Sequence, residues 1–261
     1  MHPPPNPANH GREAFHLTQP RFDTASTAPA PRLAPARPRA TRPRSPGPAP
    51  EGSRRALNVV LAVTGLVLAA PLMLMIAVLV KATSRGPVLY TQPRVGLDRR
   101  NGGKPRPVSR RADDSGGRPF RIYKFRTMYH APSTADAEVW ASPDDPRVTP
   151  LGRVLRQYRL DELPQLVNVL LGDMNLVGPR PEQPQIFRRL RTRIDGYHQR
   201  QRVRPGITGW AQINQHYDRS LEDVRRKVAL DLEYVAGQST WADVKILLRT
   251  VPVVILRRGA W

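Results

Sequence analysis

The chain has 261 residues, which is enough for one or two domains with a buried core. It contains no cysteine, so disulfides and cysteine-based metal sites are excluded, in agreement with a cytoplasmic location. Its 42 Lys and Arg residues against 21 Asp and Glu residues give a net charge of +21, which favours polyanionic partners such as nucleic acid, anionic lipid or phosphorylated substrates.

The N-terminal segment, residues 1–53, is predicted to be a disordered tail. Residues 1–55 hold 13 of the 29 prolines and carry 9 arginines against 3 acidic residues, without apolar periodicity. Such a segment cannot bury enough apolar surface to offset the entropy lost on folding. The tail either rests its basic part on anionic lipid headgroups or has no role of its own.

An uncharged apolar run of 25 residues, Ala56–Val80, follows the tail. A helix of this length can cross the roughly 30 Å hydrocarbon core of a bilayer, and a buried helix of a soluble protein is rarely so long and so uniformly apolar. Pro71 lies past the middle of the run and predicts a kink. Both flanks are basic, which permits both ends to be cytoplasmic. We therefore interpret residues 54–82 as a membrane helix, either spanning or broken and re-entrant, and residues 83–261 as a cytoplasmic domain.

Two strands are expected after the membrane helix, Val88–Gln92 and Phe120–Phe125. Residues 98–118 between them are rich in Gly, Pro and Arg, which is typical of an extended hairpin loop. The second strand contributes Lys124 in the run YKFRTM, and a polar surface loop is expected over residues 132–150.

The central stretch, Arg156–Glu182, contains the adjacent acids Asp161 and Glu162. Pro164 suits the first turn of a following helix, where a missing N–H costs nothing. Apolar residues then recur at helical spacing and a glycine follows them: Leu163, Leu166, Val167, Leu170 and Gly172. The two acids therefore lie near a helix N-terminus, which keeps a carboxylate ionised and can also bind phosphate.

Arginines surround this acid pair, Arg156 before it and Arg180 after it, between two prolines. Carboxylates among arginines indicate a site for a metal-bound phosphate ester. The alternative is that Asp161 is a helix N-cap and that the arginines form a solvated face. The Gly-Pro and Arg-Pro turns around the stretch favour the site, because a simple cap does not require them.

Two features follow the central stretch. A helix is expected over Ile186–Ile194, and its basic face lies either in the lipid interface or in water. The run RPGITGWAQIN, Arg204–Asn214, predicts a turn or loop in which Thr208 and Trp210 could line a pocket.

Two helices are expected at the C-terminal end of the chain. Ser220 with Asp223 forms a capping-box pattern for a helix that runs towards Ala236, and Thr240 with Asp243 forms the same pattern for the last helix. The apolar face of the last helix is expected to consist of Leu247, Leu248, Val251 and Ile255.

The runs YKFRTM, LDELPQLVNVLLGDMNLVGPRPE and RPGITGWAQIN resemble the signatures of the bacterial sugar transferase family, the monotopic polyprenyl-phosphate phosphoglycosyl transferases. The similarity covers roughly Arg54–Trp261 in collinear order. It implies a mainly α fold with a small β-hairpin (α+β) and a Pro-broken re-entrant membrane helix. Many members have Ser-Pro at the helix break, whereas this chain has Ala70-Pro71. The loop over residues 98–118 is also longer and more basic than usual in the family.

The resemblance also implies a reaction. A sugar-1-phosphate passes from a UDP-sugar to undecaprenyl phosphate through a covalent aspartyl intermediate, UMP leaves, and Mg²⁺ is the cofactor. The expected location is the cytoplasmic face of the bacterial inner membrane, in contact with its lipid. The expected role is the first membrane step of exopolysaccharide, O-antigen or capsule-type glycan synthesis. The sugar stays unspecified, and a homo-oligomer stays open.

Residue by residue, the resemblance makes Asp161 the nucleophile and a magnesium ligand, with Glu162 as its partner. The residues implied for substrate or phosphate binding are Lys124, Arg156, Arg180, Arg204, Thr208 and Asp231.

An alternative hypothesis is a binding protein instead of an enzyme: a membrane-tethered protein that binds a polyanion such as nucleic acid. Only the net charge suggests it. Binding nucleic acid requires a basic surface but has no use for an adjacent acid pair. The acid pair therefore favours the enzyme, and no nucleic-acid partner is expected.

Overall fold

The structure is a computed structural model that describes residues 51–98, 116–129, 145–215 and 220–256. These residues belong to one compact unit, Arg44–Trp261. Residues 1–50 of the predicted tail and most of the predicted loops over 98–118 and 132–150 lie outside the described residues. Residues 51–53, predicted to belong to the tail, instead begin helix α1 (Glu51–Thr83).

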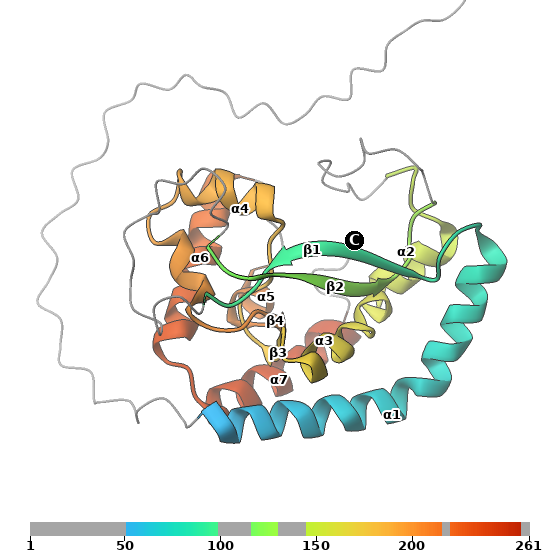
Figure 1. Cartoon of the computed structure of the whole chain (residues 1–261), viewed down its shortest axis with the longest axis horizontal. Helices are drawn as coiled ribbons and strands as arrows, with labels where there is room; N and C mark the ends of the chain where they lie inside the picture. Colours follow the sequence, from blue (N-terminus) through green and yellow to red (C-terminus); the bar gives the residue numbers. More distant parts are fainter. Residues whose placement is uncertain (1–50, 99–115, 130–144, 216–219, 257–261) are drawn as a thin grey trace, which may run out of the picture. The chain divides into compact units, whose positions relative to one another are not determined.

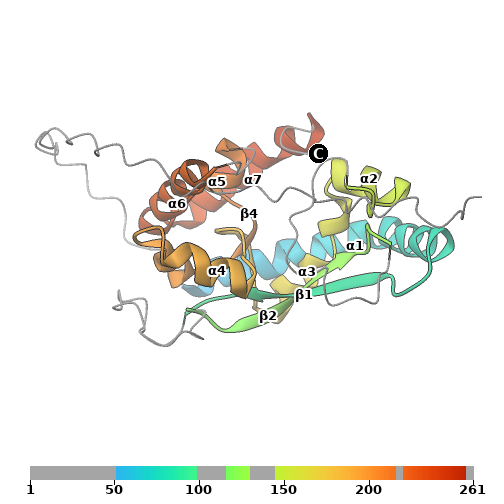
Figure 2. The same ribbon diagram turned by 90° about the horizontal axis from the view of Figure 1, so that it is seen from above.

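The described part of the chain is mainly helical and contains two small β-sheets (Figure 1). Its elements in chain order are α1 (Glu51–Thr83), β1 (Leu89–Val95), β2 (Pro119–Phe125), α2 (Pro150–Gln157), η2 (Leu160–Glu162), α3 (Gln165–Leu171), β3 (Asn175–Val177), α4 (Pro184–Arg191), η3 (Tyr197–Arg202), β4 (Gly206–Thr208), α5 (Trp210–Asn214), α6 (Leu221–Ala236) and α7 (Thr240–Ile255). The expected α+β class and the antiparallel hairpin are confirmed. Figure 2 shows the hairpin of β1 and β2 along one edge of the unit and α6 and α7 along the opposite edge.

A second sheet pairs β3 with β4 in parallel, and the sequence did not predict it. The run Arg204–Asn214, interpreted as a loop, contains β4 and the short helix α5. Directly after β3, a side chain at Gly178 would collide with the main chain of Arg204 and Gly206. Glycine is therefore required at this position by the close approach of two backbones.

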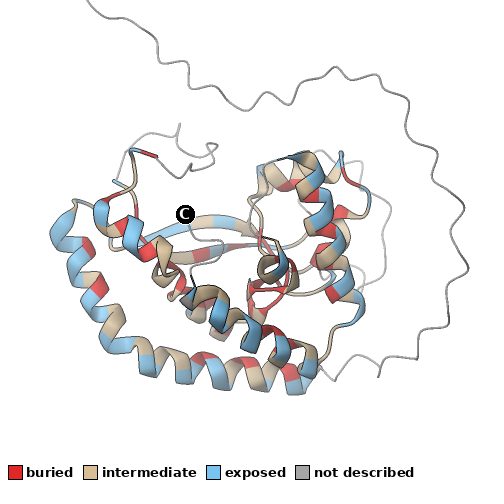
Figure 3. Cartoon of the chain, turned by 180° about the vertical axis from the view of Figure 1, so that it is seen from behind, coloured by how far each residue is buried: buried red, intermediate tan, exposed pale blue. Residues whose placement is uncertain are grey.

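Helix α1 is the long apolar helix of the structure. It has 33 residues with Pro71 inside it, and Figure 1 shows that its two halves run in different directions. Proline removes one backbone hydrogen bond and clashes with the preceding turn, which accounts for a bend. Only 11 % of its most apolar 18-residue stretch is buried, and Figure 3 shows exposed residues along the helix. Its length, composition and exposure make α1 a candidate membrane helix.

The start of α1 is bound to the rest of the unit by two arginines. The guanidinium of Arg54 pairs with Asp243 of α7, with 2.7 Å between Nη2 and Oδ2. Arg55 donates to the carbonyl oxygens of Val169 and Leu170 at 2.6 and 2.8 Å. Because the last carbonyls of a helix lack partners within it, Arg55 acts as a C-terminal cap of α3.

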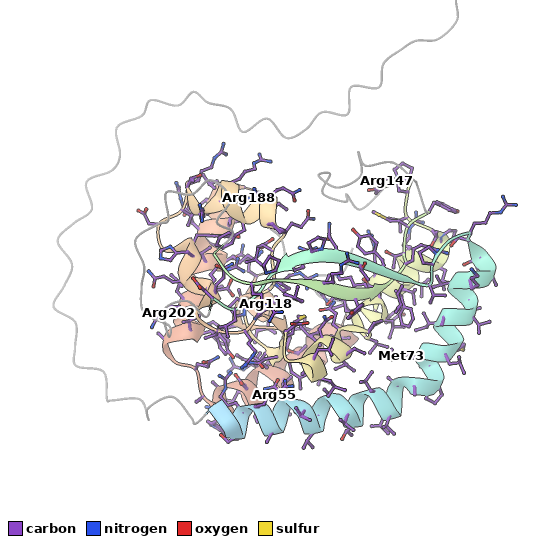
Figure 4. The ribbon with its side chains drawn as sticks, in the orientation of Figure 1. Arg55, Met73, Arg118, Arg147, Arg188 and Arg202 are labelled. Atoms are coloured by element: carbon purple, nitrogen blue, oxygen red, sulfur yellow. The ribbon has the colours of Figure 1, made fainter. Side chains whose placement is uncertain are left out.

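The end of α1 is held in the same way. Arg126, which directly follows β2, donates to the carbonyl oxygens of Val80 and Ser84 at 3.2 and 2.7 Å. The last turn of α1 is thereby fixed to the hairpin, and Met73, labelled in Figure 4, packs against the same cluster as Val80.

Helix α4 uses its apolar face in the core. Phe187 is buried in a cluster with Ile194, Tyr197, Val224 and Val228. Figure 1 places α4 and the first half of α1 on opposite sides of the hairpin. The structure therefore favours a solvated basic face over the lipid-interface alternative for this helix.

The caps of the last two helices differ from each other. The capping box of Ser220 and Asp223 forms as predicted. The predicted cap of α7 was wrong, because the side chain of Ser239, not that of Thr240, accepts from Ala242 N. Asp243 does not close a capping box but pairs with Arg54.

The predicted apolar face of α7 is partly covered, because Leu247 packs against the buried cluster of Val177, Tyr234 and Ile246. Ile246 is buried, whereas Leu248 and Val251 are 66 % and 54 % exposed. The compact unit that exposes these two side chains of α7 also exposes apolar side chains of α1.

Candidate active site

The two adjacent acids lie on η2, between α2 and α3. Arg159, directly before η2, has φ 54°, a left-handed conformation that costs a residue with a side chain about 1 kcal/mol. The turn at Arg159 ends α2 and starts the segment on which Asp161 and Glu162 are buried, with 7 % and 6 % of their surface exposed. Pro164 follows at the N-cap of α3, one position before the expected first turn. Because α3 has only seven residues, side chains rather than a helix dipole dominate the charge of the site.

Glu162 is held by two cations. Its Oε1 lies 2.8 Å from Lys124 Nζ and 2.7 Å from Arg180 Nη2. Burial alone would raise the pKa of Glu162, but Arg180 and Lys124 outweigh it and hold that pKa well below its usual value. Glu162 is therefore an ionised carboxylate that orients two basic side chains.

Asp161 has a different environment. Its Oδ2 lies 3.8 Å from Lys124 Nζ, and it accepts no hydrogen bond from the residues that the structure describes. Burial raises the pKa of Asp161, and Lys124 opposes this effect. Of the two acids, Asp161 is thus the one whose oxygens remain available to a ligand.

Arg156, in the last turn of α2, is the third basic residue beside the pair Asp161 and Glu162, which we call the dyad. Its Nε donates to Thr127 Oγ1 at 2.9 Å. Burial lowers the pKa of Arg156, and the nearby Asp161 carboxylate opposes this effect. Three cations, Lys124, Arg156 and Arg180, therefore surround two carboxylates, and the net positive charge suits an anionic ligand.

Three other residues predicted for the site have partners of their own. Arg204 donates from Nε to the carbonyl of Gly172 at 3.1 Å. Thr208 is buried, and its hydroxyl lies 2.8 Å from that of Thr250. Asp231 is buried on α6.

A second charge cluster was missed by the sequence analysis. Asp231 Oδ2 lies 2.7 Å from Arg200 Nε, and Glu182 Oε1 lies 3.1 Å from Lys227 Nζ. Arg200 Nη1 also lies 3.8 Å from Glu182 Oε1. Asp231 was singled out in the sequence, but its partner Arg200 is 31 residues away and no local spacing connects them.

Of the two acids, Asp161 fits a magnesium ion that is held partly by substrate phosphates. The described residues contain no group of three or more His, Asp or Glu side chains that could enclose a metal. Mg²⁺, however, is usually held by one or two carboxylates together with substrate phosphates. Asp161, with oxygens that accept no described hydrogen bond, meets this requirement, whereas Glu162 is occupied by its two cations.

Known proteins resemble this chain over most of its length. A model of the bacterial sugar transferase family matches residues 50–257. The chain is 42 % identical over 213 residues to an undecaprenyl-phosphate glucose phosphotransferase of Komagataeibacter xylinus, covering 80 % of this chain and 37 % of that protein. It is 41 % identical over 207 residues to a UDP-N-acetylgalactosamine-undecaprenyl-phosphate N-acetylgalactosaminephosphotransferase of Aeromonas hydrophila, covering 79 % and 44 %.

A shorter relative is matched over more of its length. The chain is 40 % identical over 210 residues to a UDP-glucose:undecaprenyl-phosphate glucose-1-phosphate transferase of Caulobacter vibrioides, covering 80 % of this chain and 72 % of that protein. The chain spans less than half the length of the first two relatives.

Proposed function

Because the chain belongs to the bacterial sugar transferase family, we propose that it transfers a sugar-1-phosphate from a UDP-sugar to undecaprenyl phosphate and releases UMP. The name of the relative from A. hydrophila supports this class of donor and acceptor, and the name of the relative from K. xylinus supports the acceptor. The observation that carries the proposal is the difference between the two acids. Glu162 is held by two cations, while Asp161 accepts no hydrogen bond from the described residues.

The transfer takes place in two steps. A carboxylate oxygen of Asp161 attacks the β-phosphorus of the UDP-sugar, the bond from this phosphorus to the bridging oxygen breaks, and UMP leaves with the bonding electrons. A phosphate oxygen of undecaprenyl phosphate then attacks the same phosphorus, the aspartyl bond breaks, and the carboxylate of Asp161 is restored. Two steps allow a water-soluble donor and a lipid acceptor to use one site in turn.

The basic side chains stabilise the charge on the transferred phosphoryl group. Lys124 and Arg180 are oriented by Glu162 at 2.8 and 2.7 Å, so their positions are set before the substrate binds. Charge-assisted hydrogen bonds from such preorganised donors are strong and need little rearrangement during the reaction. Arg156 adds a third cation on the side of Asp161.

Asp161 would hold Mg²⁺ together with the donor's phosphates. When bound, the ion would offset the repulsion between the Asp161 carboxylate and the diphosphate and stabilise the leaving UMP.

We further propose that α1 is re-entrant, with both of its ends and the active site on the cytoplasmic side of the bacterial inner membrane. Arg54 near its start and Ser84 just after its end are both bound to the same compact unit. Ala62 in its first half and Ile76 in its second half are buried against that unit. A folded unit that packs along both halves of the helix cannot lie on both sides of a bilayer.

The sugar is not assigned. The relatives named for glucose and for N-acetylgalactosamine are 42 % and 41 % identical to the chain, so identity does not favour either sugar. On this proposal, the product begins the membrane stage of a surface glycan such as an exopolysaccharide.

The test combines a substrate panel with a trapping experiment. Purified protein with Mg²⁺ and undecaprenyl phosphate is expected to release UMP from at least one UDP-sugar. With that sugar labelled and no acceptor, the labelled sugar phosphate should remain on the peptide that contains Asp161, with at most stoichiometric UMP. If both substrates must bind together and no labelled peptide can be trapped, the transfer is direct and Asp161 is only a metal ligand.

A further inference from the structure

The segment that carries Arg180, Pro179–Glu182, is held at each of its four carbonyl groups. Its first carbonyl accepts from the main-chain N of Gly206 at 3.0 Å, and its last accepts from the main-chain N of Val95 at 2.9 Å. Two of its four residues are prolines, which have no N–H to donate. The carbonyl groups therefore attach the main chain of this segment to the described residues around it.

The two central carbonyls are bound by side chains. The carbonyl of Arg180 accepts from Arg200 Nη2 at 3.1 Å, and that of Pro181 accepts from Arg94 Nη1 at 3.1 Å. A side chain can leave a carbonyl far more easily than a neighbouring strand can, so the position of Arg180 depends on how firmly Arg200 itself is fixed.

Arg200 is fixed by its remaining donors. Its Nε donates to Asp231 Oδ2 at 2.7 Å, and its Nη1 donates to Tyr197 Oη at 3.0 Å. Arg200 and Asp231 are only 4 % and 2 % exposed. The planar guanidinium presents its N–H groups in a rigid fork, so one side chain can join Asp231 on α6 to the carbonyl of Arg180.

The packing around the segment is incomplete. A cavity of about 20 Å³ lies against it, lined in part by Arg180, Glu182 and Arg200. A space of this size holds about one water molecule and leaves room for the segment to shift. The hydrogen bond from Arg200 opposes such a shift.

We propose that Arg200, oriented by Asp231, is a positioning residue that sets the place of Arg180 in the active site. Arg180 in turn contacts Glu162 at 2.7 Å. This inference rests on the proposed function and gives Asp231 a role other than the substrate binding that the sequence suggested. Asp231 acts through Arg200 and does not touch the substrate.

The first test is a double-mutant cycle with Arg200→Lys and Arg180→Lys. A lysine at 200 keeps the charge beside Asp231 but cannot also reach the carbonyl of Arg180. In the single variant Arg200→Lys, we expect kcat to fall about 10- to 100-fold with little change in the KM for the UDP-sugar, because small displacements of a positioned group have effects of this size. In the Arg180→Lys background, Arg200→Lys should have no further effect. If the two effects multiply instead, Arg200 does not act through Arg180 and the proposal is overturned.

Two further variants separate positioning from folding. Asp231→Asn keeps an acceptor for Arg200 without the charge and should show a smaller loss with the same dependence on Arg180. Lys227→Met removes a contact to Glu182 in the same cluster but touches no carbonyl of the segment, and it should retain kcat. A loss of kcat in Lys227→Met equal to that in Arg200→Lys would show that the cluster only supports the fold.

The second test needs no turnover. Phenylglyoxal modifies arginine side chains, and mass spectrometry reports its rate at each position. Arg200→Lys should increase the rate at Arg180 several-fold and leave the rates at the buried Arg54 and Arg126 unchanged. An unchanged rate at Arg180 overturns the positioning role. If this rate rises while the wild-type protein converts no UDP-sugar, the proposed function fails and the positioning of Arg180 stands.

Discussion

Replacing Arg54 by methionine is expected to destabilise the protein strongly. Arg54 donates to Asp243 Oδ2 from Nη2 and Nε at 2.7 and 3.0 Å, and to Tyr234 Oη at 3.0 Å. Arg54 and Asp243 are 7 % and 2 % exposed. Removing one partner of such a buried pair costs about 3 to 5 kcal/mol. The remaining Asp243 carboxylate would keep the hydrogen bond from Tyr234 Oη at 2.7 Å but would lose the opposite charge of Arg54.

Thermal unfolding in detergent micelles, followed by circular dichroism, measures this cost. A domain of this size loses about 2 to 4 °C of Tm per kcal/mol, so Arg54→Met should lower Tm by about 6 to 20 °C. The double variant Arg54→Met/Asp243→Leu should recover most of this loss, because it leaves no buried charge. The matched control is Arg225→Met, whose partner Glu222 is 3.2 Å away and whose pair is exposed; it should cost less than about 1 kcal/mol.

Two outcomes would refute this reasoning. One is an Arg54→Met variant with the same Tm as Arg225→Met, which would mean that the buried pair adds nothing to stability. The other is a double variant as unstable as the single one, which would mean that the unpaired charge of Asp243 is not the source of the loss.

Three further predictions concern the dyad, a buried glutamate and the topology of α1. Asp161→Asn should abolish UMP release, because the proposed nucleophile is lost, and a fully active Asp161→Asn would contradict the proposed mechanism. Glu162→Gln should impair UMP release strongly, because the side chain that orients Lys124 and Arg180 is lost. Burial would raise the pKa of Glu182, but neighbouring cations lower it from 4.5 to about 2. The contribution of the ionised Glu182 carboxylate to the free energy of unfolding is therefore present at neutral pH and lost as pH falls from about 4.5 to about 2. Denaturant midpoints over that range should fall less in Glu182→Gln than in the wild type. With no native cysteine, Ser53→Cys and Thr83→Cys should each react with thiol reagents only from the cytoplasmic side, and periplasmic labelling of either would show a span.

The parts of the fold that the sequence predicted depend on local patterns. Gly172 ends α3 with φ 82°, as its position after the apolar run indicated. Ser220 and Asp223 are three residues apart and close their capping box without help from elsewhere. The hairpin was predictable because each strand has seven residues and lies beside a turn signal.

The parts that were not predicted depend on contacts between distant residues. β3 and β4 have three residues each, which is too short for an alternating pattern to be visible. Asp243 matched the capping pattern of Thr240, but Arg54, 189 positions away, binds it instead. Asp231 was named through the family resemblance, and no local spacing in the sequence could reveal Arg200 as its partner.

The exposed face of α7 shows a second limit of prediction from the sequence. Leu248 and Val251 recur at helical spacing, and this periodicity has the same form whether the face meets a core or a lipid. The structure leaves both residues exposed on the unit that carries α1. Spacing therefore identified the apolar face of α7, but only the fold shows that more than half of the surface of these two side chains is exposed.

Helix α1 and the candidate active site are held by the same parts of the chain. Arg55 of α1 caps the C-terminus of α3, the helix that begins three residues after Glu162. Arg126 caps the end of α1 and lies two residues after Lys124, which contacts Glu162 at 2.8 Å. A displacement of either end of α1 is therefore passed to the dyad or to Lys124 through hydrogen bonds to main-chain carbonyls. The position of α1 therefore bears on the positions of Asp161, Glu162 and Lys124, and the helix is part of the scaffold of the candidate active site.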